Sequence, residues 1–151
     1  MDYHPERVKT FQALRPVKQF SGGRQSKRVS LLSGNQVVAK EFDTNNSKQR
    51  KGFRREVKNM KYVKDCSFVP RLLAVDKQKM VIYTSYAGER PAKYTKELKS
   101  KVRSRISKLR NEYHLTRKFH RHGLPRLANV AVNHQNEVRL IDLGPPFRRT
   151  K

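Results

Sequence analysis

The stretch VKQFSGGRQSKRVSLLSGNQVVAKEF, which runs from Val17 to Phe42, decides the first half of the fold. It holds three runs with strand-like patterns, separated by two polar turns that contain glycine. The runs are Val17–Phe20, Arg28–Leu32 and Gln36–Phe42, and the turns are Ser21-Gly22-Gly23 and Ser33-Gly34-Asn35. Strands joined by short turns pair antiparallel. The stretch therefore predicts an antiparallel meander.

A helix and two further strands are predicted after this meander. Asn46 or Ser47 can cap a helix, and the apolar residues that follow recur at helical spacing until about Asp65. The strand-like runs Leu72–Val75 and Met80–Thr84 come next and are joined by a polar turn. We expect both runs to belong to the first half of the molecule.

The second half is predicted to be led by a long helix. Residues 85–91 have the composition of a linker, and an apolar stripe among Lys and Arg predicts a helix from about Thr95 to His122. Gly123 and Pro125 end that pattern. The runs Asn129–Val132 and Glu137–Leu143 predict a short hairpin. The chain thus belongs to the α+β class, and its lack of internal repeats favours one domain.

Charge limits the partners that the protein can attract. The 151 residues include 36 Lys or Arg and only 12 Asp or Glu, which gives a formal net charge of +24. Apolar residues make up 35% of the chain, enough for one real core. A surface this basic attracts nucleic acid, an acidic protein or anionic lipid, and the charge alone does not choose among them.

The cysteine content and the hydropathy indicate a cytoplasmic location. Cys66 is the only cysteine, so no intrachain disulfide and no zinc site built on several cysteines can form. No apolar run reaches the roughly 18 residues of a membrane span. The segment Met1 to Lys9 has no apolar stretch of the kind found in secretory signals. We therefore expect a protein of a reducing compartment.

Two motifs in the first half resemble those of a known family. Val37-Val38-Ala39-Lys40 ends the third strand, and Glu56 lies in the helix that follows. In the protein kinase-like superfamily, a lysine in this position binds the nucleotide phosphates and a helical glutamate pairs with it. The stretch from Tyr83 to Glu89 is similar to the family's hinge, which implies adenine contacts at Tyr86 and Ala87.

The second half contains residues similar to the family's magnesium ligands. Asn129 is followed thirteen residues later by Asp142, in the sequence Ile141-Asp142-Leu143-Gly144. The resemblance extends over roughly Val17 to Gly144 and implies ATP and Mg²⁺ as cofactors, with Asn129 and Asp142 on the metal. Gly22 and Gly23 lie where the family has a glycine-rich phosphate loop, but the full pattern of spaced glycines is missing.

The catalytic loop departs from the family pattern. His122-Gly123-Leu124-Pro125-Arg126-Leu127-Ala128-Asn129 fits the frame of that loop without gaps, yet Leu124 stands where the catalytic aspartate belongs. No Asp or Glu occurs between Glu112 and Glu137. Arg126 matches the position of a lysine that neutralises the transferred phosphate, and His120 is a candidate substitute base. Loss of the aspartate should slow phosphate transfer.

The resemblance implies a reduced member of the superfamily, of the small bacterial or phage type typified by lipopolysaccharide kinases and RIO-like kinases. Residues 1–85 would form the N-terminal lobe, an antiparallel sheet with one helix, and residues 86–151 a truncated C-terminal lobe. The chain reaches Lys151 soon after Asp142, so the usual activation segment and peptide-binding helices are not expected. Any substrate would then be held by the basic surface or by a partner.

Three functions remain open on the sequence. The first is a minimal ATP-dependent phosphotransferase. The second is a catalytically inactive kinase-fold regulator that binds nucleic acid or an acidic protein, with aromatic residues near basic groups stacking on bases. The candidate aromatic residues are Tyr3, Phe11, Phe20, Tyr94 and Phe147. The third is a plain basic α+β binding module in which the motif matches arise by chance.

Overall fold

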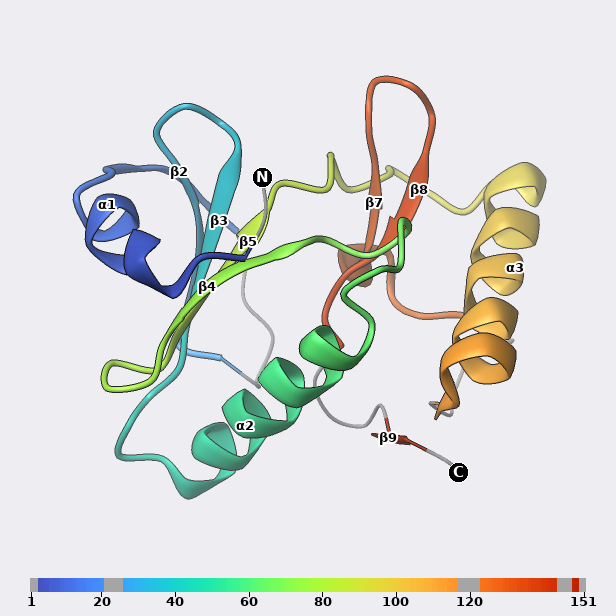
Figure 1. Cartoon of the computed structure of the whole chain (residues 1–151). Helices are drawn as coiled ribbons and strands as arrows, with labels where there is room; N and C mark the ends of the chain where they lie inside the picture. The colour runs from blue at the N-terminus through green and yellow to red at the C-terminus, as the bar shows by residue number, and fades with distance from the viewer. Residues whose placement is uncertain (1–2, 21–25, 117–122, 144–147, 150–151) are drawn as a thin grey trace. The chain divides into compact units, whose positions relative to one another are not determined.

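The structure is a computed structural model that describes residues 3–20, 26–116, 123–143 and 148–149. It is an α+β protein, and most of its helices and strands are labelled in Figure 1. The chain divides into two compact units, here called the first unit (residues 1–64 and 71–86) and the second unit (residues 65–70 and 87–151). Among the described residues, no helix is both long enough and apolar enough to cross a membrane.

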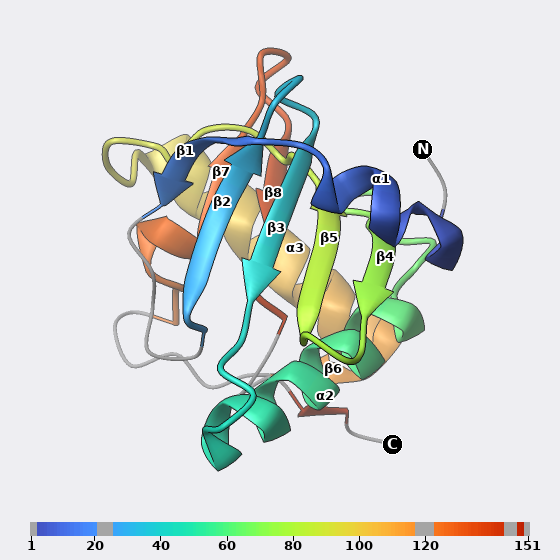
Figure 2. The same ribbon diagram turned by 90° about the vertical axis from the view of Figure 1, so that its left-hand side faces the viewer.

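The first unit is built on a five-stranded antiparallel sheet, which Figure 2 shows face on. The strand order is β1-β2-β3-β5-β4. The strands are β1 (Pro16–Phe20), β2 (Arg28–Leu32), β3 (Val37–Glu41), β4 (Leu72–Asp76) and β5 (Val81–Ser85). The predicted meander and the two later strands are confirmed, with ends displaced by at most one residue. Asn35 at the β2–β3 turn has a left-handed backbone (φ 57°), a conformation that asparagine tolerates well.

One face of this sheet packs against the N-terminal segment. The short 3₁₀ helix η1 (Pro5–Arg7) and α1 (Val8–Gln12) lie against β4. Phe11 is 4% exposed, and its ring centroid lies 5.2 Å from that of Tyr83. The expectation that Phe11 stacks on a base is therefore wrong, because its side chain is part of the core.

Helix α2 (Ser47–Tyr62) belongs to the first unit. The Asn46 side chain accepts a hydrogen bond from the Gln49 amide, so the predicted cap is confirmed. The residues that α2 buries follow helical spacing: Gly52, Phe53, Glu56, Asn59 and Met60. Phe53 packs edge-on against Phe42, which follows β3, with ring centroids 5.4 Å apart. The inward face of α2 is thereby fixed, and Glu56 lies on it.

Helix α3 (Lys96–Tyr113) leads the second unit and is shorter than the sequence predicted. It does not continue to His122, because His114 adopts a left-handed backbone (φ 55°) and its amide bonds the Leu109 carbonyl. The apolar stripe ends at Tyr113, and the next positions on that face of a longer helix are polar. Leu115 lies off the stripe and is 1% exposed in the structure, so ending the helix buries it.

Short strands complete the second unit. Strand β6 (Leu115–Thr116) pairs with β9 (Arg148–Arg149), and β7 (Val130–Val132) pairs with β8 (Val138–Leu140). The predicted hairpin is thus confirmed, except that Asn129 belongs to the preceding 3₁₀ turn, η2 (Leu127–Asn129). Helix α3 packs against β8 and β6. Residues 65–70 join this unit through a hydrogen bond from the Leu140 amide to the Phe68 carbonyl, 2.8 Å long.

Candidate functional site

Lys40 is held by the central part of the first sheet. It lies on β3, between Val29 of β2 and Ile82 of β5 in the register of the ladder. Successive side chains of a strand point to opposite faces, so Lys40 projects away from the face where Ala39 joins the core around Phe11. The side chain is only 13% exposed. A largely buried ammonium is stable only when it is paired.

Glu56 provides the pairing charge. Its Oε1 lies 2.7 Å from Lys40 Nζ, and its own side chain is 5% exposed. Two elements that the sequence separates by sixteen residues are thereby joined, β3 and the buried face of α2. The ion pair implied by the resemblance is present in the structure. The carboxylate accepts a hydrogen bond from the ammonium of Lys40, which has three N–H donors in total. This bond fixes the direction in which the Lys40 side chain points.

The β7–β8 hairpin brings Asn129 close to Asp142 in the second unit. In the hairpin register, Val130 faces Leu140, so the next positions outward are residues 129 and 141. The Ile141 amide donates a 3.0 Å hydrogen bond to the Asn129 carbonyl. Asp142 follows directly, and both Asn129 and Asp142 are partly buried. The thirteen-residue spacing in the sequence thus corresponds to adjacency across a hairpin.

The backbone of Asp142 is in an uncommon conformation. Its φ of 66° lies in the left-handed region, where residues other than glycine are rare. Leu143, the next residue, is 1% exposed and anchors this point of the chain. Four other described residues that are not glycine share this conformation, Asn35, Met80, His114 and Asn136, and aspartate is among the residue types that tolerate it. The backbone at Asp142 therefore has a defined conformation but is not by itself a sign of function.

Asn129 and Asp142 together offer an amide oxygen and a carboxylate. Mg²⁺ prefers oxygen ligands and is commonly held by one or two protein groups together with substrate phosphates. Within the described residues, no three His, Cys, Asp or Glu side chains gather as a metal cage. Asn129 and Asp142 could supply two oxygen ligands, the number that proteins commonly give to Mg²⁺.

The loop before Asn129 contains Leu124, at the position where the resemblance implies a catalytic aspartate. Leu124 is 8% exposed, so its side chain packs in the second unit's interior. The neighbouring Pro125 carbonyl accepts a 2.7 Å hydrogen bond from the Tyr94 hydroxyl. Burial raises the pKa of Tyr94 to about 12, so its phenol stays protonated and able to donate even in alkaline solution near pH 10. Arg126 is exposed at the start of η2, three residues before Asn129.

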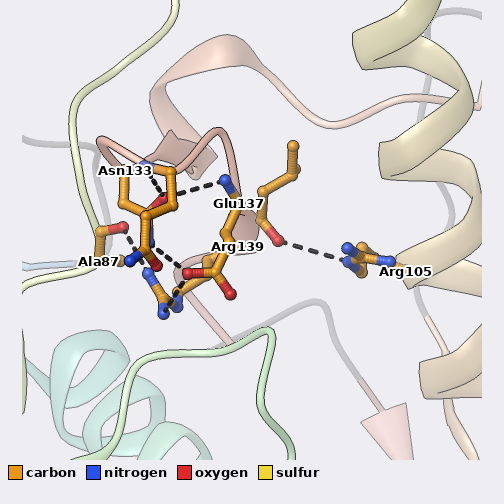
Figure 3. A network of polar contacts seen from close by, with 7 residues as sticks. Ala87, Arg105, Asn133, Glu137 and Arg139 are labelled. Atoms are coloured by element: carbon orange, nitrogen blue, oxygen red, sulfur yellow. Dashed lines mark hydrogen bonds and ion pairs between the residues drawn. The ribbon is translucent and has the colours of Figure 1, made fainter.

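The predicted hinge contacts are already engaged within the protein. The Tyr86 amide donates to the Gln36 carbonyl at 2.9 Å in the first unit. In the second unit, the Ala87 carbonyl accepts a hydrogen bond from Arg139 Nη1 at 3.2 Å (Figure 3). The Glu137 carboxylate lies 3.9 Å from Arg139 and also accepts from Asn133. An adenine at this position would have to use other backbone groups of the hinge.

Several predicted residues lie outside the described part of the chain: Gly22, Gly23, His120, His122, Gly144 and Phe147. Of the other candidate stacking residues, Tyr3 is 38% exposed. Phe20 stacks on Tyr86 with centroids 6.4 Å apart, and the Tyr94 hydroxyl is bonded to Pro125. Tyr3 is thus the aromatic candidate whose exposure is best suited to stacking among those that the structure describes.

Two features were missed in the sequence. The first is Arg139, whose bond to the hinge carbonyl depends on tertiary structure and has no signal in the sequence. The second is the solvent-facing side of α2, where Lys51, Arg54, Arg55 and Lys58 lie on one face. Their spacing of three and four residues was a readable signal.

The sequence was also compared with known proteins. No protein-family model matches the chain, and no curated protein is significantly similar to it. The functional argument therefore depends on the geometry of the site.

Proposed function

We propose that the protein is a kinase-like, ATP- and magnesium-binding protein. The observation that carries this proposal is the buried ion pair between Lys40 on β3 and Glu56 on α2. A lysine oriented by a buried glutamate is suited to neutralise nucleotide phosphates as a fixed point charge. Removing a charged pair from water carries a desolvation cost that its mutual attraction offsets only in part, so a buried pair in the core of the first unit supports a role beyond stability, such as binding.

The magnesium part of the proposal involves Asn129 and Asp142. Their oxygens would hold Mg²⁺ beside the phosphates, and the metal would neutralise charge on the nucleotide. The hairpin register and the left-handed backbone at Asp142 support this assignment because both hold the aspartate in a defined position. The proposal thus assigns phosphate binding to the first unit and metal binding to the second.

Phosphate transfer, where it occurs, is expected to be slow. Transfer depends mainly on positioning and charge neutralisation, and the missing carboxylate would have oriented the acceptor hydroxyl. Arg126 is exposed and permanently charged, so it can stabilise charge on the transferred phosphate. The proposed activity is therefore that of a weak, atypical phosphotransferase with an acceptor held by other residues.

A catalytically inactive nucleotide-binding protein is the second candidate. The burial of Leu124 favours it, because an apolar side chain packed at the position of the base cannot orient an acceptor hydroxyl. Nucleotide binding is common to both candidates, and they differ only in turnover. Phosphate release or transfer measured with radiolabelled ATP separates them, since only turnover that Asp142→Asn abolishes belongs to this site.

The test of nucleotide binding is a double-mutant cycle with Lys40→Ala and Asp142→Asn. Displacement of a fluorescent ATP analogue would give affinities with and without magnesium. We expect Lys40→Ala to weaken ATP binding about tenfold in both conditions, and Asp142→Asn to weaken it only when magnesium is present. The combined loss should differ from the sum of the two, because both groups would act on one nucleotide.

Matched controls remove the same charges elsewhere. Lys9→Ala alters an exposed lysine of α1, and Asp65→Asn alters an exposed aspartate of the second unit. Both control variants should retain the affinity of the unaltered protein within about twofold, because exposed charges are screened by salt. The proposal fails if the site variants behave like these controls.

A further inference from the structure

The outward face of α2 carries a cluster of positive charge. Lys51, Arg54, Arg55 and Lys58 are all exposed and line one shallow depression. At 1.5 Å per residue they extend over about 10 Å of helix. The only acidic residue of α2 is Glu56, and it points inward to Lys40. This basic face therefore has no counter-charge on its own helix.

Among the residues that the structure describes, these four side chains have no polar partner. Within the described part of the chain, none of them forms an ion pair or a side-chain hydrogen bond. By contrast, the exposed helix α3 pairs its Lys101 with Glu97 one turn away, at 3.1 Å. The basic face of α2 thus differs from an ordinary solvated helix surface, in which charges of both signs alternate.

This arrangement is unfavourable for the helix itself. Residues 51 and 54, 51 and 55, 54 and 58, and 55 and 58 are like-charged neighbours on the helix surface. The first turn of α2 contains no acidic residue, although negative charge there would be favoured by the helix dipole. A cluster that weakens the fold is best explained by a ligand that carries compensating negative charge.

The shape and composition of the face point to one kind of ligand. A helix that binds a membrane inserts apolar side chains, but the apolar residues Phe53 and Met60 of α2 are buried in the first unit. Stable protein interfaces have an apolar, aromatic centre, which this face lacks. Closely spaced Lys and Arg without apolar neighbours fit a row of phosphates.

An exposed aromatic ring adjoins the same helix. Lys61, one turn beyond Lys58, places its Nζ 5.7 Å from the centroid of the Tyr3 ring. Tyr3 is one of the two large apolar or aromatic side chains that are exposed in the described residues. An exposed ring beside a basic surface can stack on an unpaired base, as in proteins that bind single strands.

We propose that the basic face of α2, formed by Lys51, Arg54, Arg55 and Lys58, binds the phosphate backbone of a single-stranded nucleic acid, with Tyr3 available to stack on a base. The contacts are to phosphates, so binding is independent of sequence and falls steeply with salt. This function is separate from nucleotide binding at Lys40, which lies on the opposite side of α2.

The test compares two variants that lose equal charge. In the first, Lys51, Arg54, Arg55 and Lys58 are all replaced by Gln. In the control, Gln replaces four exposed lysines on other elements of the first unit: Lys9, Lys18, Lys77 and Lys79. Fluorescence anisotropy with a labelled oligouridylate of about 20 nucleotides, long enough for a typical single-strand site, would measure affinity over a salt series.

We expect the α2 variant to bind the oligonucleotide at least about tenfold more weakly. The slope of log K against log salt should become shallower by about 2, which corresponds to the loss of roughly three phosphate contacts. The affinity of the control variant should stay within about threefold of that of the unaltered protein, because it loses only the long-range attraction that both variants lose. The α2 variant should also unfold at a higher temperature, since four like-charge pairs are removed.

Equal weakening by the two variants would overturn the proposal, because net charge alone would then explain binding. It would also be overturned if the α2 variant kept full affinity for the oligonucleotide while losing affinity for phosphatidylserine vesicles or for polyglutamate. Should the fourfold variant fail to fold, the pair Arg54→Gln and Arg55→Gln gives the same comparison against Lys77→Gln and Lys79→Gln.

Discussion

The Nζ atom of Lys40 lies 2.7 Å from Oε1 of Glu56, and both side chains are largely shielded from water, at 13% and 5% exposure. This one contact joins the central strand of the first sheet to the buried face of α2. Glu56 shares this buried face with Phe53 and Met60, so the exposed Lys and Arg of α2 lie on the opposite side of the helix. The candidate nucleotide lysine and the proposed nucleic-acid face thus lie on opposite sides of α2.

Removing one partner of this pair should destabilise the protein markedly. Glu56→Gln removes the carboxylate that lies 2.7 Å from the largely buried Lys40 ammonium, and we expect a loss of about 3 kcal/mol in the free energy of unfolding. Urea unfolding followed by circular dichroism measures it. The double variant Lys40→Met/Glu56→Leu should recover most of that loss, because neither charge remains buried.

The matched control is the exposed pair of Glu97 and Lys101, whose N–O distance is 3.1 Å. Glu97→Gln should change the free energy of unfolding by no more than about 0.5 kcal/mol, as is typical of exposed helix pairs. A loss for Glu56→Gln as small as that of the control would show that Lys40 and Glu56 are not a stabilising buried pair.

Gly88 is required by a close approach between two backbones. Its φ is +127°, and a Cβ atom there would lie 2.5 Å from the Val132 carbonyl oxygen. Glu89 and Val132 exchange two hydrogen bonds of 2.9 Å at this point, so the backbones cannot separate freely. We expect Gly88→Ala to destabilise the second unit by more than about 2 kcal/mol, measured by urea unfolding.

Gly123→Ala provides the comparison for Gly88. Gly123 also has a positive φ, +67°, but no atom of the described residues lies within 4 Å of the position that a Cβ would take. Its substitution should therefore cost only the intrinsic penalty of a left-handed residue, about 1 kcal/mol. Equal losses for the two variants would mean that the contact with Val132 has no energetic role.

Alkaline pH should destabilise the second unit through Tyr94. Burial raises the pKa of Tyr94 to about 12, whereas the unfolded chain would release this proton near pH 10. Between these values the unfolded state loses the proton and the folded state keeps it, so the free energy of unfolding falls as pH rises. Tyr83, Tyr113 and Cys66, whose pKa values burial also raises, act in the same direction.

Tyr94→Phe isolates the contribution of this residue. At neutral pH the variant should be less stable by about 1 kcal/mol, because the hydrogen bond to the Pro125 carbonyl is lost. Between pH 10 and 12 its stability should fall less steeply than that of the unaltered protein. Urea unfolding at a series of pH values measures both effects, and parallel curves would contradict the assignment to Tyr94.

Local patterns predicted much of the fold. Alternating residues and glycine turns located the strands of the first sheet, and the helical spacing after Asn46 located α2, because these signals act over a few residues. The thirteen residues from Asn129 to Asp142 contain the β7–β8 hairpin in the structure, and this hairpin brings the two residues close together.

The failures concern tertiary contacts. The C-terminal end of α3 depends on the burial of Leu115, and the bond from Arg139 to Ala87 joins residues 52 positions apart. Phe11 resembled an exposed aromatic near basic residues, yet a distant partner, Tyr83, makes it part of the core. Sequence patterns report which face of an element is apolar and leave open what covers that face.

The central claim is that Asp142 holds magnesium beside a bound nucleotide, and thermal unfolding with ATP and magnesium tests it most directly. A ligand that binds only the folded state raises the unfolding midpoint. We predict a magnesium-dependent rise that is lost in Asp142→Asn, whose asparagine tolerates the same left-handed backbone, and is kept in Asp65→Asn. No rise at millimolar ATP, or an equal rise in Asp142→Asn, would contradict the claim.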